Sequence, residues 1–185
     1  MIRDGRDVSY SYMIRVKQKL NAENFKNQLY DWLEVNERAL ENCIKVGSTN
    51  CLQVRYEDLV LQPEMTIRKI IKFLNLKWTD KFLNHQDYIG NEIKVDRNGW
   101  STHQIVKPIN SESINSWIGK IQNFNPEQIR FIEPMLNKFN YTFDLTNMNY
   151  TLDKLVIENN KKLKENKDYW IQIGRNYSDH FKKFN

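Results

Sequence analysis

The sequence predicts an α/β protein that is mostly helical and has a few short strands. Three segments, residues 23–46, 63–74 and 126–139, carry apolar residues at the three- and four-residue spacing of amphipathic helices. A further segment, CLQVRYEDLV at 51–60, is rich in β-forming residues and follows a tight turn, so we expect a strand there. A chain of 185 residues is long enough for one domain with a real core.

The chain opens with what we interpret as a strand end followed by a helix. Met1 and Ile2 suit the last residues of a strand, and residues 4–20 suit a helix. Two residues are too few for a strand that stands by itself. We therefore expect the chain to be part of a larger fold that begins upstream.

The helices that follow have recognisable ends. Gly47 comes directly after the periodic segment 23–46, in the position where glycine commonly ends a helix. Pro63 and Pro126 suit the first turn of the two later helices. Residues 84–116 have few periodic apolar positions, which predicts an irregular, exposed segment of the kind that often carries function.

Composition limits the classes of function. The net charge of +5 favours anionic partners without choosing among them, and the basic residues are scattered, so we do not expect nucleic acid as the partner. Apolar runs reach only three or four residues, which predicts no membrane span. The three histidines are scattered and predict no metal site. Cys43 and Cys51 are either a disulfide or two buried thiols.

The N-terminal segment has the residue types of a phosphate site. Arg3 lies at the junction of strand and helix, where an α/β fold binds ligands. Ser11 and Arg15 are four apart and so share a helical face, which permits a pocket of guanidinium and hydroxyl groups around a phosphate. In the alternative interpretation, Arg15 pairs with a surface carboxylate and Ser11 only packs.

Four motifs in order extend this interpretation. IRDGRDVSYSYMIR resembles the 3′-phosphate-binding segment of the tyrosylprotein sulfotransferases, and NCIKVGSTNCLQVRYEDLVLQPE, STHQIVKPIN and WIGKI resemble later segments of that family. The resemblance covers about residues 1–140 and implies the C-terminal part of a P-loop-type sulfotransferase catalytic domain, with a few parallel strands. Residues 141–185 are expected to be a polar, partly ordered C-terminal extension.

The resemblance implies a site for 3′-phosphoadenosine 5′-phosphosulfate, the sulfate donor, and no metal. The 3′-phosphate would be held by Arg3, Ser11 and Arg15. Tyr56 would contact the nucleotide, although a half-buried strand aromatic is its ordinary interpretation. The nucleotide would also be covered by the loop Ser101, Thr102, His103, Gln104, Ile105, Val106, Lys107, Pro108, Ile109 and Asn110, in which Ser101 would assist the transfer.

The implied reaction moves a sulfuryl group in line to a tyrosine hydroxyl in an acidic segment of a secretory or membrane protein, in the Golgi lumen. The family also implies a homodimer and a disulfide between Cys43 and Cys51. Three N-x-S/T sequons, at Asn140, Asn149 and Asn176, are about as many as chance gives and favour a glycoprotein only weakly.

The chain departs from the family pattern at several points. Asp7 stands where a small residue is usual near the phosphate, and Ser116 stands where a lysine usually reaches the cofactor. The family's 5′-phosphosulfate loop and its catalytic glutamate precede the segment that matches here, and the six glycines of this chain are isolated. The alternative is therefore a catalytically inactive module that binds the nucleotide or an acidic peptide.

Overall fold

Helices and loops make up most of the structure, a computed structural model that describes residues 1–99, 101–144 and 150–177. The chain divides into two compact units, and each is described here by itself. The first unit contains Met1–Glu57 and Ser113–Tyr150, and the second contains Asp58–Glu112 and Thr151–Asn185. Each unit is therefore assembled from segments that are far apart in the sequence.

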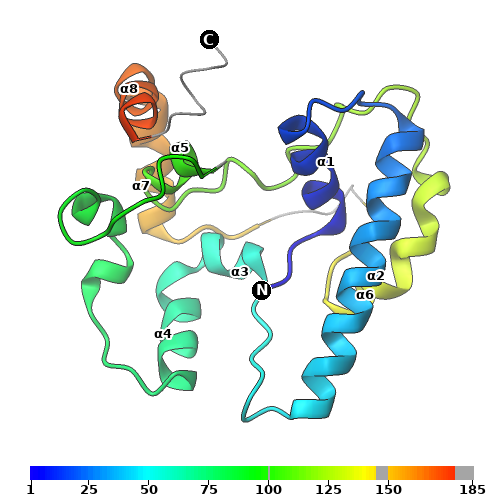
Figure 1. Cartoon of the computed structure of the whole chain (residues 1–185), viewed down its shortest axis with the longest axis horizontal. Coiled ribbons are helices and arrows are strands. Elements are labelled where there is room, and N and C mark those ends of the chain that lie inside the picture. Colours follow the sequence, from blue (N-terminus) through cyan, green and yellow to red (C-terminus); the bar gives the residue numbers. More distant parts are fainter. Residues whose placement is uncertain (100, 145–149, 178–185) are drawn as a thin grey trace. The chain divides into compact units, whose positions relative to one another are not determined.

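The first unit is built on the long helix α2 (Ala22–Val46), which lies beside the short helix α1 (Gly5–Arg15) (Figure 1). The 3-10 helix η3 (Pro126–Ile132) also packs against α2 and continues into helix α6 (Glu133–Lys138). The predicted helices at 23–46 and 126–139 are confirmed, with the latter divided into a 3-10 segment and an α-helical segment. The helix predicted at 4–20 is shorter than expected, since α1 ends at Arg15. Gly47 ends α2 with a positive φ of 79°, a conformation that glycine adopts at no steric cost.

The core of the first unit is rich in aromatic and large aliphatic side chains. The ring of Phe25 stacks on Trp117 with 5.7 Å between the centroids, and Leu29 is fully buried on the same helix as Phe25. The buried cluster contains Met13, Phe25, Leu29, Trp32, Trp117, Ile121, Ile129, Ile132, Met135, Leu136, Phe139 and Tyr141. Apolar burial of this extent is the main source of the unit's stability.

The predicted strand at 51–60 is wrong, because residues 51–54 form no strand and the second half is helical. Helix α3 (Tyr56–Leu61) takes its place, and the pairing that remains is one parallel bridge between Ile2 and Arg55. In the bridge, Ile2 N donates to Val54 O at 2.8 Å and Tyr56 N donates to Ile2 O at 2.7 Å. Because Ile2 is the one described residue that pairs with this segment, the β-ladder does not continue beyond Arg55. Over the residues that the structure describes, β-pairing is confined to isolated bridges.

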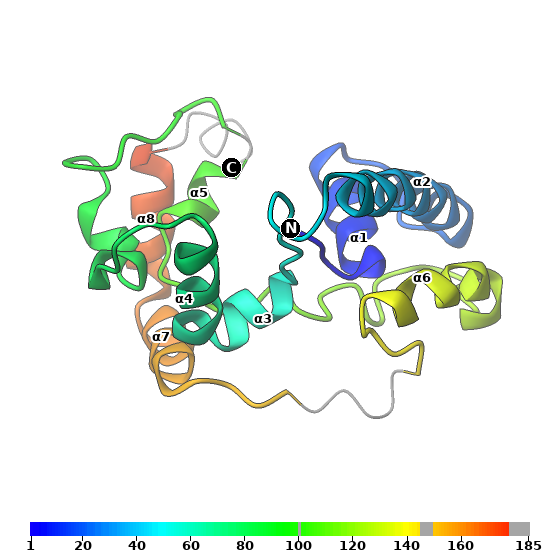
Figure 2. The ribbon, with the colours of Figure 1, turned by 90° about the horizontal axis from the view of Figure 1, so that it is seen from below.

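The second unit is also helical (Figure 2). Its helices are α4 (Pro63–Phe73), α5 (Thr102–Ile105), α7 (Lys154–Glu165) and α8 (Lys167–Tyr177), joined by the 3-10 helices η1 (Asp80–Phe82) and η2 (His85–Tyr88). Pro63 begins α4, as predicted. Val106 and Val156 are buried in this unit, and α5 packs against α8.

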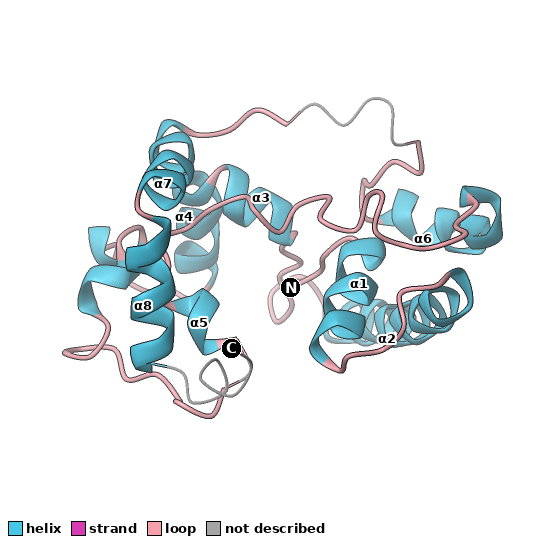
Figure 3. Cartoon of the chain, turned by 90° about the horizontal axis from the view of Figure 1, so that it is seen from above, coloured by secondary structure: helices cyan, strands magenta, loops and turns pink. Residues whose placement is uncertain are grey.

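The segments expected to be irregular contain more helix than their composition indicates. Short helices η2 and α5 lie within 84–116, while α7 and α8 occupy much of the expected polar extension at 141–185 (Figure 3). Helix α7 has an acidic N-cap, since the Asp153 side chain accepts from Leu155 N at 2.8 Å. None of the helices described has the length and apolar character that crossing a bilayer requires.

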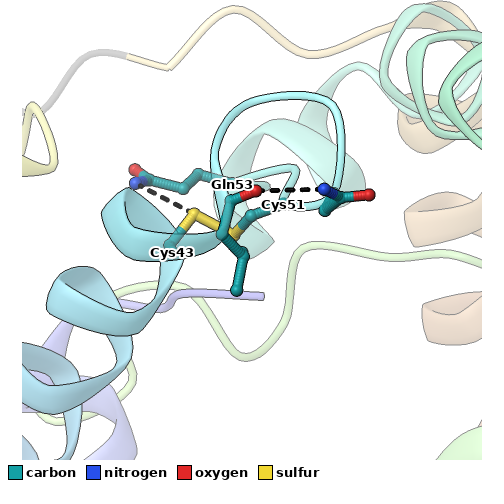
Figure 4. The surroundings of a disulfide bond; sticks show 5 residues. Cys43, Cys51 and Gln53 are labelled. Carbon is teal, nitrogen blue, oxygen red and sulfur yellow. Dashed lines mark hydrogen bonds between the residues drawn. A yellow bond between two sulfur atoms is a disulfide. The ribbon is translucent and has the colours of Figure 1, made fainter.

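The disulfide between Cys43 and Cys51 is confirmed, with 5.4 Å between the two Cα atoms (Figure 4). The alternative of two buried thiols is therefore wrong. The disulfide joins the last turn of α2 to the segment that pairs with Ile2. Gln53 lies against it and donates from Nε2 to Cys43 Sγ at 3.8 Å. The disulfide consequently fixes the return of the chain from α2 to the bridge at Arg55.

Candidate functional site

The parallel bridge brings Arg3 and Tyr56 side by side, because each is the residue that follows a bridge partner. The guanidinium carbon of Arg3 lies 4.6 Å from the centroid of the Tyr56 ring, which is a cation–π contact. The carbonyl of Arg3 accepts from Trp32 Nε1 at 3.2 Å, so helix α2 also holds its backbone. The structure therefore brings together two of the residues that the sequence predicts for the nucleotide site.

Arg3 keeps hydrogen-bonding capacity in this position. Its Nη2 donates to the carbonyl oxygen of Ser113 and lies 4.0 Å from Oδ1 of Asp7. The side chain is 19% exposed, while its Nε is buried and has no hydrogen-bond partner among the described residues. A buried guanidinium donor without a partner is uncommon and is consistent with a place for an anionic ligand.

Helix α1 can start beside Arg3 because residue 5 is glycine. A Cβ atom at Gly5 would lie 2.5 Å from the ring of Trp32, so a larger residue would force α1 away from α2 at this point. The side chain of Asp4 caps the helix and accepts from Arg6 N at 2.9 Å. Local sequence thus sets both the first residue of α1 and its close approach to α2.

A buried polar network beneath the site was not predicted. Arg6 is 1% exposed, and its Nε and Nη2 bond the carboxylate of Asp4 at 2.9 and 2.6 Å. Its terminal nitrogens also donate to the carbonyls of Thr142 and Phe143. Only the pairing of Asp4 with Arg6 joins residues that are close in the sequence, since the other partners of Arg6 lie more than 130 residues away.

Glu57 completes the network and is also buried. Its carboxylate accepts from Asp4 N at 3.1 Å and from the Tyr141 hydroxyl at 2.5 Å. Burial raises the pKa of the Glu57 carboxyl, while these two hydrogen bonds oppose the rise. The pKa of Tyr141 is raised as well, first by burial and then by the charge of Glu57. The network ties the start of α1 to the first residues of α3, and so holds Tyr56 beside Arg3.

The pKa of Tyr56 is raised because the ring is buried, and the positive charge of Arg3 opposes that effect. The phenol is consequently neutral at physiological pH. It presents an uncharged aromatic face to the guanidinium and a hydroxyl that can still donate a hydrogen bond.

Asp7 is a further charged group at the site. It is 1% exposed, and its carboxylate accepts from Asn115 N at 2.7 Å and from Ser116 Oγ at 2.9 Å. Burial raises the pKa of Asp7, and Arg3 opposes the rise most strongly. The sequence identified Asp7 and Ser116 as separate departures from the family pattern, and the structure shows that they are hydrogen-bonded partners.

Ser11 and Arg15 lie one turn apart on α1, as their spacing predicts, and both are exposed. The guanidinium carbon of Arg15 lies 5.1 Å from the ring centroid of Tyr12. Arg3 is thus mostly enclosed, whereas Ser11 and Arg15 face solvent further along the helix. A shared phosphate contact for all three predicted residues stays a prediction.

The predicted nucleotide loop at 101–110 belongs to the second unit and contains helix α5. Ser101 is exposed immediately before the helix. Thr102 is buried, and its Oγ1 donates to Asp96 O at 2.5 Å. Gln104 and Ile105 are exposed, while Val106 and Pro108 are buried. This alternation fixes the backbone of the loop and leaves part of it accessible.

Several polar groups of the same loop already have partners. Lys107 Nζ lies 3.3 Å from Glu112 Oε2, and Asn110 Nδ2 donates to Pro108 O at 2.8 Å. The carbonyl of Ile109 accepts from Asn159 Nδ2 at 2.9 Å. The pKa of His103 is lowered by burial and by the charge of Lys107, so this imidazole is neutral at physiological pH. The contact between residues 101–110 and a nucleotide stays a prediction.

Among the residues that the structure describes, His, Cys, Asp and Glu side chains form no cluster of three or more that could hold a metal ion. The described site combines the Arg3 guanidinium and the Tyr56 ring with the Asp7 carboxylate, and its guanidinium is the group that suits an organic phosphate.

The chain is similar in sequence to known proteins. The sequence profile of the Sulfotransferase family matches residues 1–80 of this chain. Over most of its length the chain is similar to protein-tyrosine sulfotransferases in particular. It is 32% identical to protein-tyrosine sulfotransferase A of Caenorhabditis elegans over 175 residues, which is 93% of this chain and 46% of the relative.

Two further relatives give the same result. Identity to the protein-tyrosine sulfotransferase of Drosophila melanogaster is 32% over 92% of this chain and 35% of the relative. Identity to protein-tyrosine sulfotransferase 1 of Danio rerio is 33% over 89% of this chain and 48% of the relative. The chain thus spans about half the length, or less, of the curated relatives that it matches.

Proposed function

We propose that the chain serves in a protein-tyrosine sulfotransferase, which transfers a sulfuryl group from 3′-phosphoadenosine 5′-phosphosulfate to tyrosine hydroxyls in acidic protein segments. The observation that carries the proposal is the position of Arg3. Its guanidinium lies on Tyr56 at the start of α1, within the segment that matches the Sulfotransferase family. The similarity to protein-tyrosine sulfotransferases over most of the chain supports the acceptor class.

In this proposal the 3′-phosphate is held by Arg3, Ser11 and Arg15, and the nucleotide contacts Tyr56. Arginine suits this role because its planar fork matches two phosphate oxygens and it keeps its charge at every physiological pH. The partial burial of Arg3 strengthens its attraction for an anion, since water screens it less. The exposed Ser11 and Arg15 are accessible to the same phosphate from solvent.

The nucleotide supplies the activated sulfuryl group when it is bound. The loop at 101–110 would contact the nucleotide, and the exposed Ser101 hydroxyl would donate a hydrogen bond where negative charge develops during transfer. Lys107 would add positive charge in the same loop. Such a reaction depends mainly on positioning and on electrostatic stabilisation, as phosphoryl transfer does.

The setting proposed for this activity is the Golgi lumen, with secretory or membrane proteins as acceptors and a homodimer as the assembly. The disulfide between Cys43 and Cys51 supports an oxidising compartment. The net charge of +5 suits acceptor tyrosines that are flanked by acidic residues. Asn140, in an N-Y-T sequon, is exposed and is proposed as a glycosylation site. Asn149 lies outside the described residues.

Calorimetric titration of the chain with adenosine 3′,5′-bisphosphate tests the phosphate site. We expect Arg3→Ala to weaken binding about 10- to 100-fold, because a charge-assisted hydrogen bond contributes about 1.5–3 kcal/mol. Arg38→Ala is the matched control, since Arg38 is an exposed arginine that pairs with Glu34 on α2. Adenosine 5′-monophosphate, which lacks the 3′-phosphate, should bind weakly and be insensitive to Arg3→Ala. Absence of binding to the unsubstituted chain would refute the proposal.

Transfer of radiolabelled sulfate to an acidic tyrosine peptide separates the enzyme from the inactive binding module. The assay uses a chain that also carries the part of the relatives that lies outside the match, because the match covers 46% of the Caenorhabditis elegans relative. Transfer that Arg3→Ala reduces would support the enzyme. Undiminished nucleotide binding without transfer would instead favour the binding module.

A further inference from the structure

The Asp7 carboxylate lies close to the place where the proposed function puts a phosphate. Its Oδ1 is 4.0 Å from Arg3 Nη2, and the residue is 1% exposed. Water therefore screens its charge poorly. A phosphate that approaches Arg3 would meet this fixed negative charge at short range.

Two hydrogen bonds hold the carboxylate in place. Asn115 N donates to Oδ2 at 2.7 Å and Ser116 Oγ donates to Oδ1 at 2.9 Å. Arg3 Nη2 donates to the carbonyl of Ser113, in the same loop. Asp7 and Arg3 are thus both attached to residues 113–116. If Asp7 turned away from Arg3, its carboxylate would lose the hydrogen bonds from Asn115 N and Ser116 Oγ.

We propose that the Asp7 carboxylate lowers the affinity of the anion site for the 3′-phosphate and makes that affinity depend on pH. The proposal rests on the proposed function, because it requires the phosphate to bind at Arg3. The ligand concerned is an organic phosphate, and the effect acts through charge. The same carboxylate also positions residues 113–116 against α1.

Asp7 is the carboxylate that lies next to Arg3 Nη2, and burial raises its pKa. The charged or titratable groups that face it are Arg3 and Asp4 from the start of α1 and Tyr56 from the start of α3. Residues 115 and 116 contribute an amide and a hydroxyl, which do not titrate. Arg3 stays positive, and the raised pKa of Tyr56 keeps that phenol neutral. Protonation of Asp7 as the pH falls therefore removes the charge that opposes the phosphate.

Asp7→Asn is the direct test, because it removes the charge and can keep both contacts. The amide oxygen can accept from Asn115 N, and the Ser116 hydroxyl can accept from the amide nitrogen. In calorimetric titrations at pH 7.5, we expect Asp7→Asn to bind adenosine 3′,5′-bisphosphate about tenfold more tightly than the unsubstituted chain. The ratio of the two affinities should fall toward one as the pH is lowered. Because the ligand titrates equally in both experiments, the ratio isolates Asp7.

Ser116→Ala is the matched control, since it removes one hydrogen bond of Asp7 and keeps the charge. It should keep a pH dependence that is shifted toward higher pH, because the hydrogen bond from Ser116 lowers the pKa of Asp7 and its loss raises that pKa. Asp7→Ala is a second charge-removing variant in case Asp7→Asn fails to fold, and it should also flatten that dependence. Equal or weaker binding by the folded charge-removing variants, together with loss of binding in Arg3→Ala, would overturn this inference and leave the proposed function standing. No binding by any of the chains would overturn both.

Discussion

The guanidinium of Arg3 lies over the ring of Tyr56, 4.6 Å from its centroid, because the two residues follow the two partners of one parallel bridge. This contact needs no long strand. One bridge, the carbonyl of Arg3 held by Trp32, and the buried Glu57 are sufficient to fix the two side chains. The proposed phosphate site is thus built from backbone geometry at the start of α1.

The ring of Tyr56 should contribute to nucleotide affinity through Arg3. We expect Tyr56→Leu to weaken binding of adenosine 3′,5′-bisphosphate about 2- to 30-fold, since a cation–π contact contributes about 0.5–2 kcal/mol. Tyr56→Phe keeps the ring and should bind nearly as the unsubstituted chain does. Calorimetric titration measures both. An equal loss in the two variants would assign the effect to the hydroxyl and not to the ring.

Glu57→Gln should reduce the pH dependence of stability. Because burial raises the pKa of Glu57 above its value in the unfolded chain, ionisation opposes folding. The contribution of Glu57 to the free energy of unfolding is therefore fully present below the unfolded pKa and is lost as the pH rises through the folded pKa. Urea unfolding between about pH 4 and 7 should show that the unsubstituted chain gains more stability than Glu57→Gln on acidification. Parallel curves for the two chains would contradict this account.

Removal of the disulfide should cost a moderate amount of stability. The bridge closes a loop with a sequence separation of 8, so Cys43→Ser with Cys51→Ser should lower the free energy of unfolding by about 2–3 kcal/mol. Denaturant unfolding measures the change, and the reduced unsubstituted chain is the control that should match the double variant. A loss of unfolding free energy well below 1 kcal/mol would show that contacts other than the disulfide fix the chain between α2 and Arg55.

Gly5→Ala should destabilise the contact between α1 and α2. The added methyl would lie 2.5 Å from the Trp32 ring, and overpacking of this kind costs about 1–3 kcal/mol. Gly119→Ala serves as the comparison, because it has φ of 71° but open space around the position of its Cβ. Thermal unfolding should show a larger loss for Gly5→Ala, together with weaker nucleotide binding. A smaller loss of thermal stability in Gly5→Ala than in Gly119→Ala would mean that α1 moves to accommodate the methyl group without a cost in stability.

Local sequence was enough to predict the main helices. The apolar spacing, Gly47 and Pro63 gave α2 and α4 nearly residue by residue, because periodicity and end signals are properties of neighbouring residues. The strand at 51–60 failed for the opposite reason. Its β-forming residues need a neighbouring strand, and Ile2 pairs with a single position, Arg55.

The site was predictable in part. Arg3 and Tyr56 were identified from a family motif, and the structure places them in contact. The hydrogen bonds of Asp7 to Asn115, of Arg6 to Phe143 and of Glu57 to Tyr141 could not be predicted, since they join residues 84 to 137 positions apart. Buried polar groups of this kind reveal their partners only once the chain is folded.

A crystal structure of the chain with adenosine 3′,5′-bisphosphate tests the central claim most directly. The account predicts that oxygens of the 3′-phosphate lie within about 2.7–2.9 Å of guanidinium nitrogens of Arg3, the range of a charge-assisted hydrogen bond. Tyr56 should remain against the guanidinium in the same crystal. An ordered nucleotide whose 3′-phosphate is bound away from Arg3 would contradict the account.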